Sequence, residues 1–304
     1  DIVFHQAEWS ELKPGFQNIP EPPATAPVVH PNVLLVPLLA PPAAEPGAEN
    51  PISWCLRQSP HLRQSPHLRQ SSQPLPVAIA SDAAFHFRYP EAGELLEAVG
   101  LEPRAWSPLA DEPLPDGCRA VLLPGGYPEL HTAQLAASRR SLGDLARAAA
   151  AGLPVVAECG GLLLLGSALS DAEGRPHRMA GVLPFSAQQG ALSLGYRQAT
   201  ATAHGLLVRP GETVCGHEFH RWQLEPVATN GGLWQLEGWG TPQRSEGWTA
   251  PNVHASWLHL HWAGCPVIPS RLAAATGRAA PLPTSGASSS PMSPSPRSSR
   301  SAGG

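Results

Sequence analysis

The sequence predicts an α/β fold with a mainly parallel sheet and an antiparallel C-terminal part. Three short apolar runs, each followed by a helix-like stretch, indicate alternating strands and helices between residues 76 and 181. Beyond residue 181 the runs become short, alternating and rich in Trp, which favours antiparallel strands. The 304 residues suffice for one large domain or two small ones.

Each element follows from its own pattern. PVAIAS at residues 76–81 predicts a buried strand, and PEAGELLEAVG predicts a helix that begins near Pro90 and stops at Gly100. RAVLLPGG predicts the second strand, and AQLAASRRSLGDLARAAAAG predicts one helix closed by Gly152. LPVVAEC predicts the third strand, and GGLLLLGSAL begins the next helix. The later segments ALSLGYRQATATA, ETVCGHEFHRWQLEP, GLWQLEGWG and ASWLHLHW are expected to complete the same sheet or form a small one beside it.

The composition changes on both sides of this region. Residues 1–75 are dense in Pro and Ala and contain the repeat RQSPHLRQSPHLRQSS, so a low-complexity, irregular N-terminal segment is expected. Residues 279–304 are rich in Ser, Pro and Gly and are expected to form a disordered tail. The folded domain is therefore expected at residues 76–278.

Charge and cysteine usage exclude several functions. The net charge of −4 gives no electrostatic footprint for nucleic acid or an anionic membrane. Lys13 is the only lysine and no Gly-Lys pair occurs, so the chain carries no Walker-type ATP site. The five cysteines form no C-x-x-C, no signal peptide pattern precedes them, and no apolar run reaches the roughly 20 residues of a spanning helix. A cytoplasmic, reducing compartment is expected.

The end of the third predicted strand carries a thiol. Open parallel sheets bind ligands beyond the carboxyl ends of their strands, and Cys159 lies at such an end, directly before a helix. A helix N-terminus favours the thiolate, and Gly160 and Gly161 leave backbone N–H groups free to face an oxyanion. This pattern predicts a nucleophile elbow. The alternative is that Cys159 is a small buried hydrophobic residue.

Two further strand ends bear on the same chemistry. Gly125 and Gly126 end the second strand and could offer N–H donors to a developing negative charge; the alternative is a plain turn. His259 and His261 share one face if SWLHLHW is a strand, and either could take the thiol proton and return it to leaving ammonia. The alternative for this pair is packing or incidental exposure.

Clustered histidines also raise the alternative of a metal site. The candidates are His254 with His259 and His261, or His217, Glu218 and His220 in GHEFH. HEFH is one residue short of the zinc-binding H-E-x-x-H spacing. No metal is therefore expected.

Taken together, these motifs resemble the class I glutamine amidotransferase domain, and more narrowly the cobyrinic/cobyric acid synthase type. Eight segments occur in the order found in cobyrinic acid a,c-diamide synthases, from Val77 to Gly264: VAIASDAAFHFRYPEAGELLEAVG, WSPLADEPLPDG, LLPGGYPELH, VVAECGGLLLLG, MAGVLPF, LSLGYR, GHEFHRW and ASWLHLHW. The resemblance implies a flavodoxin-like, three-layer amidotransferase fold.

The resemblance also implies residue roles. Cys159 would attack the side-chain amide of glutamine and form a thioester, and His259 would raise its nucleophilicity. Relatives with a full triad carry Glu two residues after the histidine, where this chain has His261, so a Cys-His dyad is implied. The remaining site residues are Gly125, Gly126 and Gly160 for the oxyanion and substrate, with His261 and Glu158 as supporting residues.

The implied function is to supply ammonia from glutamine for amidation of corrinoid carboxylates in cobalamin biosynthesis. The family's ATP-binding synthetase half has no counterpart in residues 1–75. No cofactor is therefore expected in this chain, and ATP and Mg²⁺ would act only on a synthetase domain or subunit supplied elsewhere. The alternatives are a stand-alone amidotransferase subunit that feeds a separate ligase, for example one that amidates a cell-wall precursor, and a catalytically silent binding module.

Overall fold

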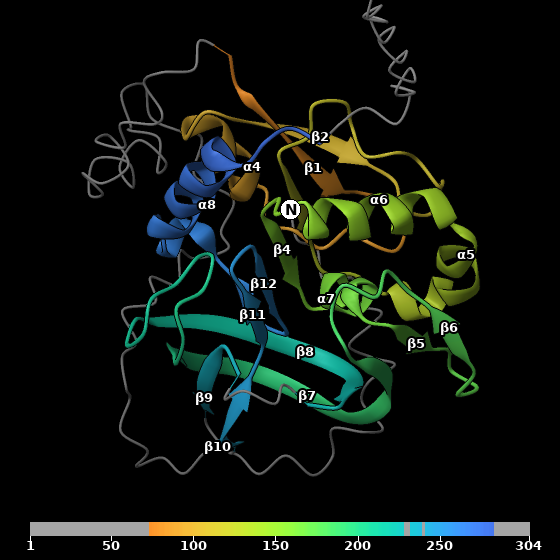
Figure 1. The fold of residues 1–304 in the computed structure, drawn as a ribbon. Coiled ribbons are helices and arrows are strands. Elements are labelled where there is room, and N and C mark those ends of the chain that lie inside the picture. The colour runs from red at the N-terminus through yellow and green to blue at the C-terminus, as the bar shows by residue number, and fades with distance from the viewer. Residues whose placement is uncertain (1–72, 228–231, 239–240, 283–304) are drawn as a thin grey trace, which may run out of the picture.

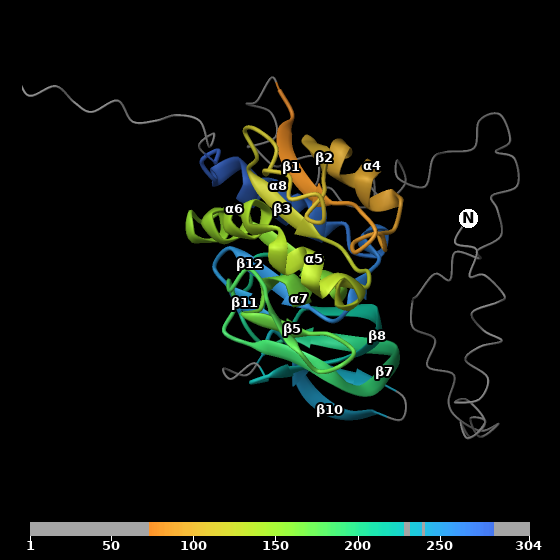
Figure 2. The same cartoon turned by 90° about the vertical axis from the view of Figure 1, so that its right-hand side faces the viewer.

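The computed structural model describes residues 73–227, 232–238 and 241–282 (Figures 1 and 2). Its first half contains β1 (Leu75–Ala80), α4 (Glu91–Ala98), β2 (Leu101–Trp106), β3 (Ala120–Leu123), the 3₁₀ turn η3 (Pro128–His131), α5 (Thr132–Ala137), α6 (Arg139–Ala150), β4 (Val155–Glu158) and α7 (Gly160–Leu165). Its second half contains β5 (Ala168–Ser170), β6 (Pro176–Arg178), β7 (Ser186–Ala201), β8 (Thr213–Glu225), β9 (Trp234–Gly238), β10 (Thr241–Glu246), β11 (Trp248–Ala250), β12 (Val253–Ser256), β13 (His259–Leu260), η4 (Trp262–Gly264) and α8 (Val267–Arg278).

The first sheet has six strands in the order β11-β12-β4-β3-β1-β2. All neighbours are parallel except β11, which runs antiparallel to β12. Alternate side chains of these strands enter two separate hydrophobic cores. The core with Ala78, Val121 and Val155 includes α6 and α7 residues, whereas the core with Val77 and Val156 includes α4 and α8 residues. Helices therefore cover both faces of the sheet, which confirms the three-layer α/β fold (Figure 1).

The second sheet is mainly antiparallel and is built around the long pair β7 and β8. β9 and β10 extend it beyond β7, and β13 pairs with the other edge of β8. It lies beside the layered part of the molecule (Figure 2). The predicted antiparallel C-terminal part is thus confirmed, although β11 and β12 join the first sheet.

Several predicted elements differ in detail. The single helix expected before Gly152 is two helices, because Ser138 has φ −77° and ψ 65° and interrupts the helical path between α5 and α6. The segment ASWLHLHW is not one strand, because β12 ends at Ser256 in the first sheet and β13 begins at His259 in the second. The sequence analysis does not predict β2, β5, β6, β10, β11 or α8, because their short or Ala-rich sequences carry weak periodicity.

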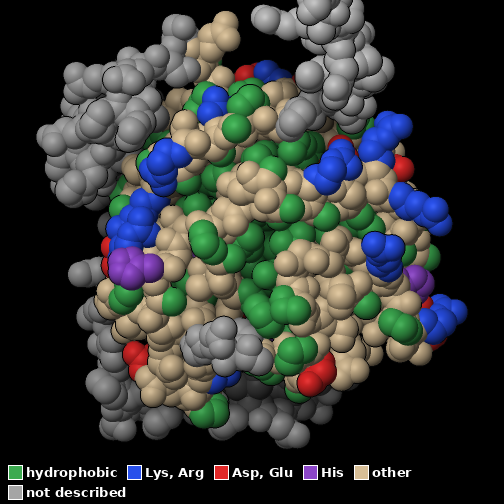
Figure 3. Space-filling view, in the orientation of Figure 1, with side chains coloured by type: hydrophobic (Ala, Val, Ile, Leu, Met, Phe, Trp, Pro, Cys, Tyr) green, Lys and Arg blue, Asp and Glu red, His purple; other side chains and the backbone are tan. Residues whose placement is uncertain are grey.

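The predictions for residues 1–75 and 279–304 fall almost entirely outside the described residues and stay predictions. Within the described ranges, no helix is both long and apolar enough to cross a bilayer. On the face shown in Figure 3, Arg side chains gather toward the two sides, and the middle is mostly hydrophobic and uncharged.

Candidate active site

Cys159 occupies a sharp turn between β4 and α7. Its backbone has φ 48° and ψ −112°, a conformation that costs energy for a residue with a side chain and that clusters at functional sites. The turn is fixed on both sides: the Cys159 N–H donates to the Ser256 carbonyl at 2.8 Å, and the Leu162 N–H donates to the Cys159 carbonyl at 3.0 Å. This is the strand-to-helix geometry of a nucleophile elbow.

The glycines after the thiol are required by close backbone contacts. A Cβ atom at Gly160 would lie 2.4 Å from the Gly126 oxygen and 2.9 Å from the Gly126 nitrogen. One at Gly161 would lie 2.0 Å from the Leu123 oxygen. Gly126 itself has φ 154° and lies against the backbone of Ala84. The structure therefore brings Gly126 and Gly160 together, as the sequence predicts.

His259 lies in β13, opposite His217 of β8. Its side chain is 5% exposed, and the edge of its ring faces Phe87 with 4.6 Å between centroids. The His217 ring stacks on it with centroids 6.1 Å apart. Gly125 leaves room for the imidazole, because a Cβ atom there would lie 2.3 Å from its Cε1. Among the described residues, no carboxylate hydrogen-bonds to this ring.

The thiol and the imidazole converge on the same two pieces of backbone. Gly125 contacts the His259 ring, and the next residue, Gly126, contacts the residue after the thiol. On β8, the Cys159 thiol donates to the Phe219 carbonyl at 3.4 Å, while His217, two residues earlier, stacks on His259. The predicted nucleophile, oxyanion glycines and base therefore share one neighbourhood.

His261 is not equivalent to His259. The expectation of one strand through both histidines is wrong, because β13 ends at Leu260 and a 3₁₀ turn follows. The His261 ring is exposed and faces Tyr89 edge-on with 4.8 Å between centroids. The two rings therefore lie in different surroundings.

Glu158 supports the segment after the histidines. Trp262 Nε1–H donates to its Oε1 at 3.3 Å. Burial raises the pKa of the Glu158 carboxyl to about 8, even though the contacts with Trp262 and the Leu260 N–H lower it. A cavity of about 30 Å³ beside Glu158 is also lined by Tyr89. Glu158 is thus mainly neutral at pH 7 and braces the η4 turn.

Burial keeps both members of the thiol–imidazole pair uncharged in the resting protein. It raises the pKa of Cys159 to about 12, against the lowering contribution of the Gly160 N–H, and nearby Glu129, Glu158 and Glu218 raise it further. Burial also lowers the pKa of His259 to about 3, with contributions from His217 and His220. The thiolate expected from the helix N-terminus is therefore disfavoured in the free protein, because burial raises the thiol pKa more than the Gly160 N–H lowers it. A neutral imidazole is the form that can accept a proton.

The GHEFH motif forms a buried ionic cluster. Glu218 is fully buried and accepts hydrogen bonds from Arg197 Nε at 2.8 Å, His220 Nε2 at 2.9 Å and Arg244. Burial raises the pKa of Glu218, but His220 and Arg244 lower it to about 2. His220 in turn stacks on Trp257 with ring centroids 3.8 Å apart. The motif thus holds the chain just before His259.

The metal alternative finds no geometric support in the described part of the chain. There, no group of three or more His, Cys, Asp or Glu side chains is arranged to hold a metal ion. The Glu218 carboxylate, the acidic member of GHEFH, is instead occupied by two arginines and His220.

Sequence reasoning missed two acidic residues of this region. Glu129 lies in η3, just after Gly125 and Gly126, where burial raises its pKa to about 7 and its charge raises the pKa of Cys159. The acid in GGYPE, directly after two glycines at a strand end, was the available signal. Glu246 lies in β10, and no local sequence signal relates it to the site.

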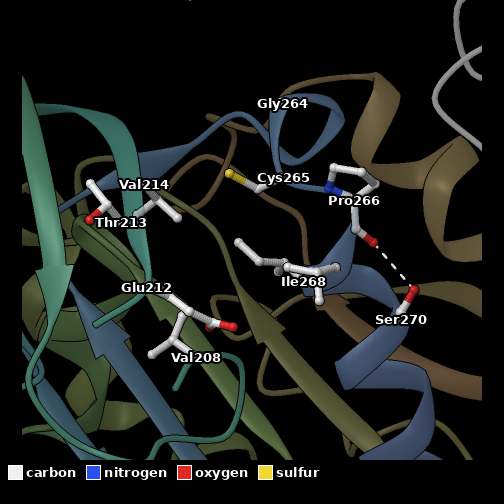
Figure 4. A pocket seen from close by; sticks show the side chains of 10 residues that line it. Val208, Glu212, Thr213, Val214, Gly264, Cys265, Pro266, Ile268 and Ser270 are labelled. Carbon is white, nitrogen blue, oxygen red and sulfur yellow. Dashed lines mark hydrogen bonds between the residues drawn. The ribbon is translucent and has the colours of Figure 1, made fainter. Parts of the chain in front are cut away.

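A separate cavity of about 350 Å³ lies between the start of β8 and the start of α8 (Figure 4). Val208, Val214 and Ile268 form its apolar wall, with Cys265 and Glu212 at its margin. None of the predicted site residues lines it.

Comparison with known proteins agrees with the geometry. Residues 76–266 match the model of the CobB/CobQ-like glutamine amidotransferase domain. The chain is 47% identical over 195 residues to a cobyrinate a,c-diamide synthase of Gloeobacter violaceus, covering 63% of this chain and 42% of that protein. It is 40% identical over 209 residues to a hydrogenobyrinate a,c-diamide synthase of Thermobifida fusca, covering 67% of this chain and 43% of that protein. A solved structure, PurLQS from Thermotoga maritima, has 17% identity and a TM-score of 0.49, covering 67% of this chain and 97% of that chain. The chain thus spans less than half of the length of these curated relatives.

Proposed function

Because this chain belongs to the CobB/CobQ-like glutamine amidotransferase family, we propose that it hydrolyses glutamine through Cys159 and His259 and delivers the ammonia to a corrinoid-amidating enzyme. The observation that carries this proposal is the convergence of a strained thiol turn, a neutral imidazole and two glycine backbones. A buried cysteine kept only for packing needs none of these three.

The chemical step begins from the neutral pair. The Cys159 sulfur forms a bond to the side-chain amide carbon of glutamine as its proton passes to the His259 imidazole. In this proposal the backbone N–H groups of Gly126 and Gly160 stabilise the oxyanion that results. The imidazolium then returns the proton to the amide nitrogen, the carbon–nitrogen bond breaks, and ammonia leaves behind a thioester. Attack by water on the thioester gives glutamate and restores the thiol.

Transfer of a proton between two neutral groups creates an ion pair in a buried site, which is costly without substrate. The thiol pKa of about 12 and the imidazole pKa of about 3 describe that cost in the free protein. Glutamine changes this balance, because the oxyanion and its N–H donors appear at the moment the charges separate. We therefore assign Cys159 and His259 as a dyad that becomes active only with substrate bound.

The acceptor follows from the relatives. Two similar proteins are named cobyrinate and hydrogenobyrinate a,c-diamide synthases, so a corrinoid carboxylate is the acceptor that we assign. An acid must be activated before ammonia can displace oxygen from it. ATP and Mg²⁺ would serve that activation on a synthetase part outside the matched residues, whereas glutamine hydrolysis needs neither.

The test is release of glutamate from glutamine by the purified chain and three variants. Cys159→Ala should abolish release, and His259→Ala should lower kcat by about 100-fold or more, as expected for loss of a general base. His261→Ala should stay within about threefold of wild type, since its exposed ring contacts Tyr89. A larger loss in the His261 variant than in the His259 variant would move the base to His261.

Full release of glutamate by Cys159→Ala would refute Cys159 as the nucleophile, and absence of release from wild type would favour a silent binding module.

The acceptor is tested separately. The chain is combined with the part of the Gloeobacter violaceus relative that lies outside the matched residues, together with ATP, Mg²⁺ and cobyrinic acid. Glutamine-dependent diamide formation is expected, and its absence with active glutamine hydrolysis would instead favour a different ligase.

A further inference from the structure

The chain crosses from one sheet to the other within three residues of the proposed base. β12 ends at Ser256 in the first sheet, next to the strand that carries the thiol. β13 begins at His259 in the second sheet, paired with β8. The short segment between them therefore determines where the imidazole lies relative to the sulfur.

One buried carboxylate holds this segment. Glu246 is 4% exposed; its Oε2 accepts the Ser256 hydroxyl at 2.7 Å, and its Oε1 accepts the Trp257 N–H at 2.8 Å. The Ser256 hydroxyl in turn accepts the Leu258 N–H at 3.1 Å and Trp234 Nε1–H at 3.2 Å. Each oxygen of the Glu246 carboxylate thus accepts one hydrogen bond from the crossing. The Ser256 hydroxyl donates one hydrogen bond and accepts two, which uses its full capacity.

The same segment is connected to both members of the dyad. The Ser256 carbonyl accepts the N–H of Cys159, so its position fixes the elbow. Trp257 is stacked on His220, and His259 follows two residues later. A shift of the Ser256 backbone would therefore change the distance between the Cys159 turn and the His259 imidazole.

The His259 imidazole must be oriented without the carboxylate that forms the third member of a full triad. Among the described residues none with a carboxylate hydrogen-bonds to His259, and position 261, two residues on, is an exposed histidine. Contacts with Gly125, Phe87 and His217 restrict the movement of the His259 ring. The backbone that presents the ring is held by Glu246.

We propose that Glu246 is a positioning residue for glutamine hydrolysis, which fixes the crossing from Ser256 to Leu258 so that His259 meets the thiol. The inference rests on the proposed function of this site. The hydrogen bonds of the Glu246 carboxylate go to Ser256 and Trp257, and none goes to the Cys159 sulfur or the His259 imidazole. Its effect passes through the backbone and reaches catalysis as the distance and direction between sulfur and imidazole.

The test compares Glu246→Gln with Ser256→Ala and with Glu212→Gln as a matched control. Glutamine keeps the size of Glu246 but replaces one acceptor oxygen with an NH₂ group that faces a donor. Ser256→Ala removes only the hydroxyl and serves if the Gln variant does not fold. Glu212 is a comparable carboxylate, because it accepts hydrogen bonds from the Arg271 guanidinium and from the Arg209 backbone N–H. It lies just before β8, far along the chain from the crossing.

Competent sites are counted by stoichiometric labelling of Cys159 with a glutamine-mimicking diazoketone, and turnover is expressed per labelled site. Glu246→Gln should lower kcat per site by about 10- to 100-fold with KM for glutamine within about twofold, because misplacement of a catalytic group acts mainly on the chemical step. Glu212→Gln should leave both unchanged. A merely structural role would lower the number of labelled sites and leave the turnover of each unchanged.

A double-mutant cycle identifies the route of the effect. In a His259→Asn background, where turnover is expressed per folded chain because the diazoketone needs the imidazole, Glu246→Gln should cause less than about a twofold further loss. Residues that act through one another are not additive. Unchanged turnover per site in Glu246→Gln and Ser256→Ala, or a full additional loss in the His259→Asn background, would overturn the proposal. Wild-type protein that hydrolyses no glutamine would instead refute the proposed function.

Discussion

The imidazole of His259 fills the space beside Gly125 that a side chain would need. A Cβ atom at position 125 would lie 2.3 Å from the ring's Cε1 and 3.2 Å from its Nδ1, well inside van der Waals contact. The glycine therefore leaves room for the ring of the proposed base as well as forming the turn. The His259 ring packs against this glycine backbone and has no carboxylate partner among the described residues.

Replacement of Gly125 by Ala should displace this ring. We expect kcat for glutamine hydrolysis to fall by about 100-fold, because a displacement of about 1 Å in a catalytic group has that effect. Gly93→Ala is the control, since position 93 lies in α4 with open space and should gain about 0.5–1 kcal/mol of stability. Steady-state kinetics and thermal unfolding measure the two variants. Equal activity in both would mean that the ring is not held by this contact.

The cysteines should respond differently to two reagents. Of the four in the described residues, Cys215 is exposed, Cys118 and Cys159 are buried, and burial raises the pKa of Cys265 to about 11. A small neutral alkylating agent should therefore modify Cys215 before Cys159. The diazoketone that mimics glutamine should modify Cys159 first, because it recruits the dyad. Peptide mass spectrometry over time follows both reactions, and the same order with both reagents would contradict substrate-dependent activation.

The charge on Glu129 should restrain the thiol above neutral pH. Its pKa is raised by burial to about 7, so the carboxylate is largely protonated at pH 6 and ionised at pH 8, where its charge raises the pKa of Cys159. Glu129→Gln should therefore increase the alkylation rate of Cys159 by about two- to tenfold at pH 8.5 and hardly at all at pH 6. Glu173→Gln, at an exposed turn, is the control. An equal increase at both pH values would rule out the charge as the cause.

Protonation of His254 should contribute to acid unfolding. The ring is 1% exposed, its Nδ1 has no hydrogen-bond partner, and burial lowers its pKa to about 4. In the unfolded chain the pKa is about 6.5, so between pH 6.5 and 4 the unfolded state binds more protons and stability falls as pH falls. The loss approaches about 3 kcal/mol near pH 4.

His254→Leu removes this titration, so urea unfolding at pH 7 and at pH 4.5 should give a smaller difference in unfolding free energy than in wild type. His177→Leu is a useful comparison, because His177 is hydrogen-bonded to Asp171 near the surface. An unchanged difference in the His254 variant would place the acid sensitivity elsewhere.

The strand ends were predictable because local sequence encodes them. A buried run that stops at Cys159 and two glycines has few other conformations available, and the same holds for Leu123 followed by Gly125 and Gly126. The thiol, the oxyanion glycines and the α/β class follow from patterns within about ten residues each. Their roles remain predictions for the variants described above.

Long-range features escaped sequence reasoning. Nothing near Glu246 indicates that it meets Ser256, ten positions later, across two sheets. The strand through His259 and His261 was overestimated because alternation predicts an extended chain but not the sheet it joins. The thiolate was expected from the helix end, whereas burial, a property of the whole fold, determines the ionisation of Cys159.

The passage of the chain between two sheets has a mechanical consequence. The Cys159 sulfur follows β4 of the first sheet, whereas the His259 imidazole belongs to β13 of the second sheet. A rotation of one half against the other by a few degrees would change their separation without altering either half internally. A small change in the angle between the two sheets would therefore change the rate of the proposed glutamine hydrolysis without a change in any reacting residue.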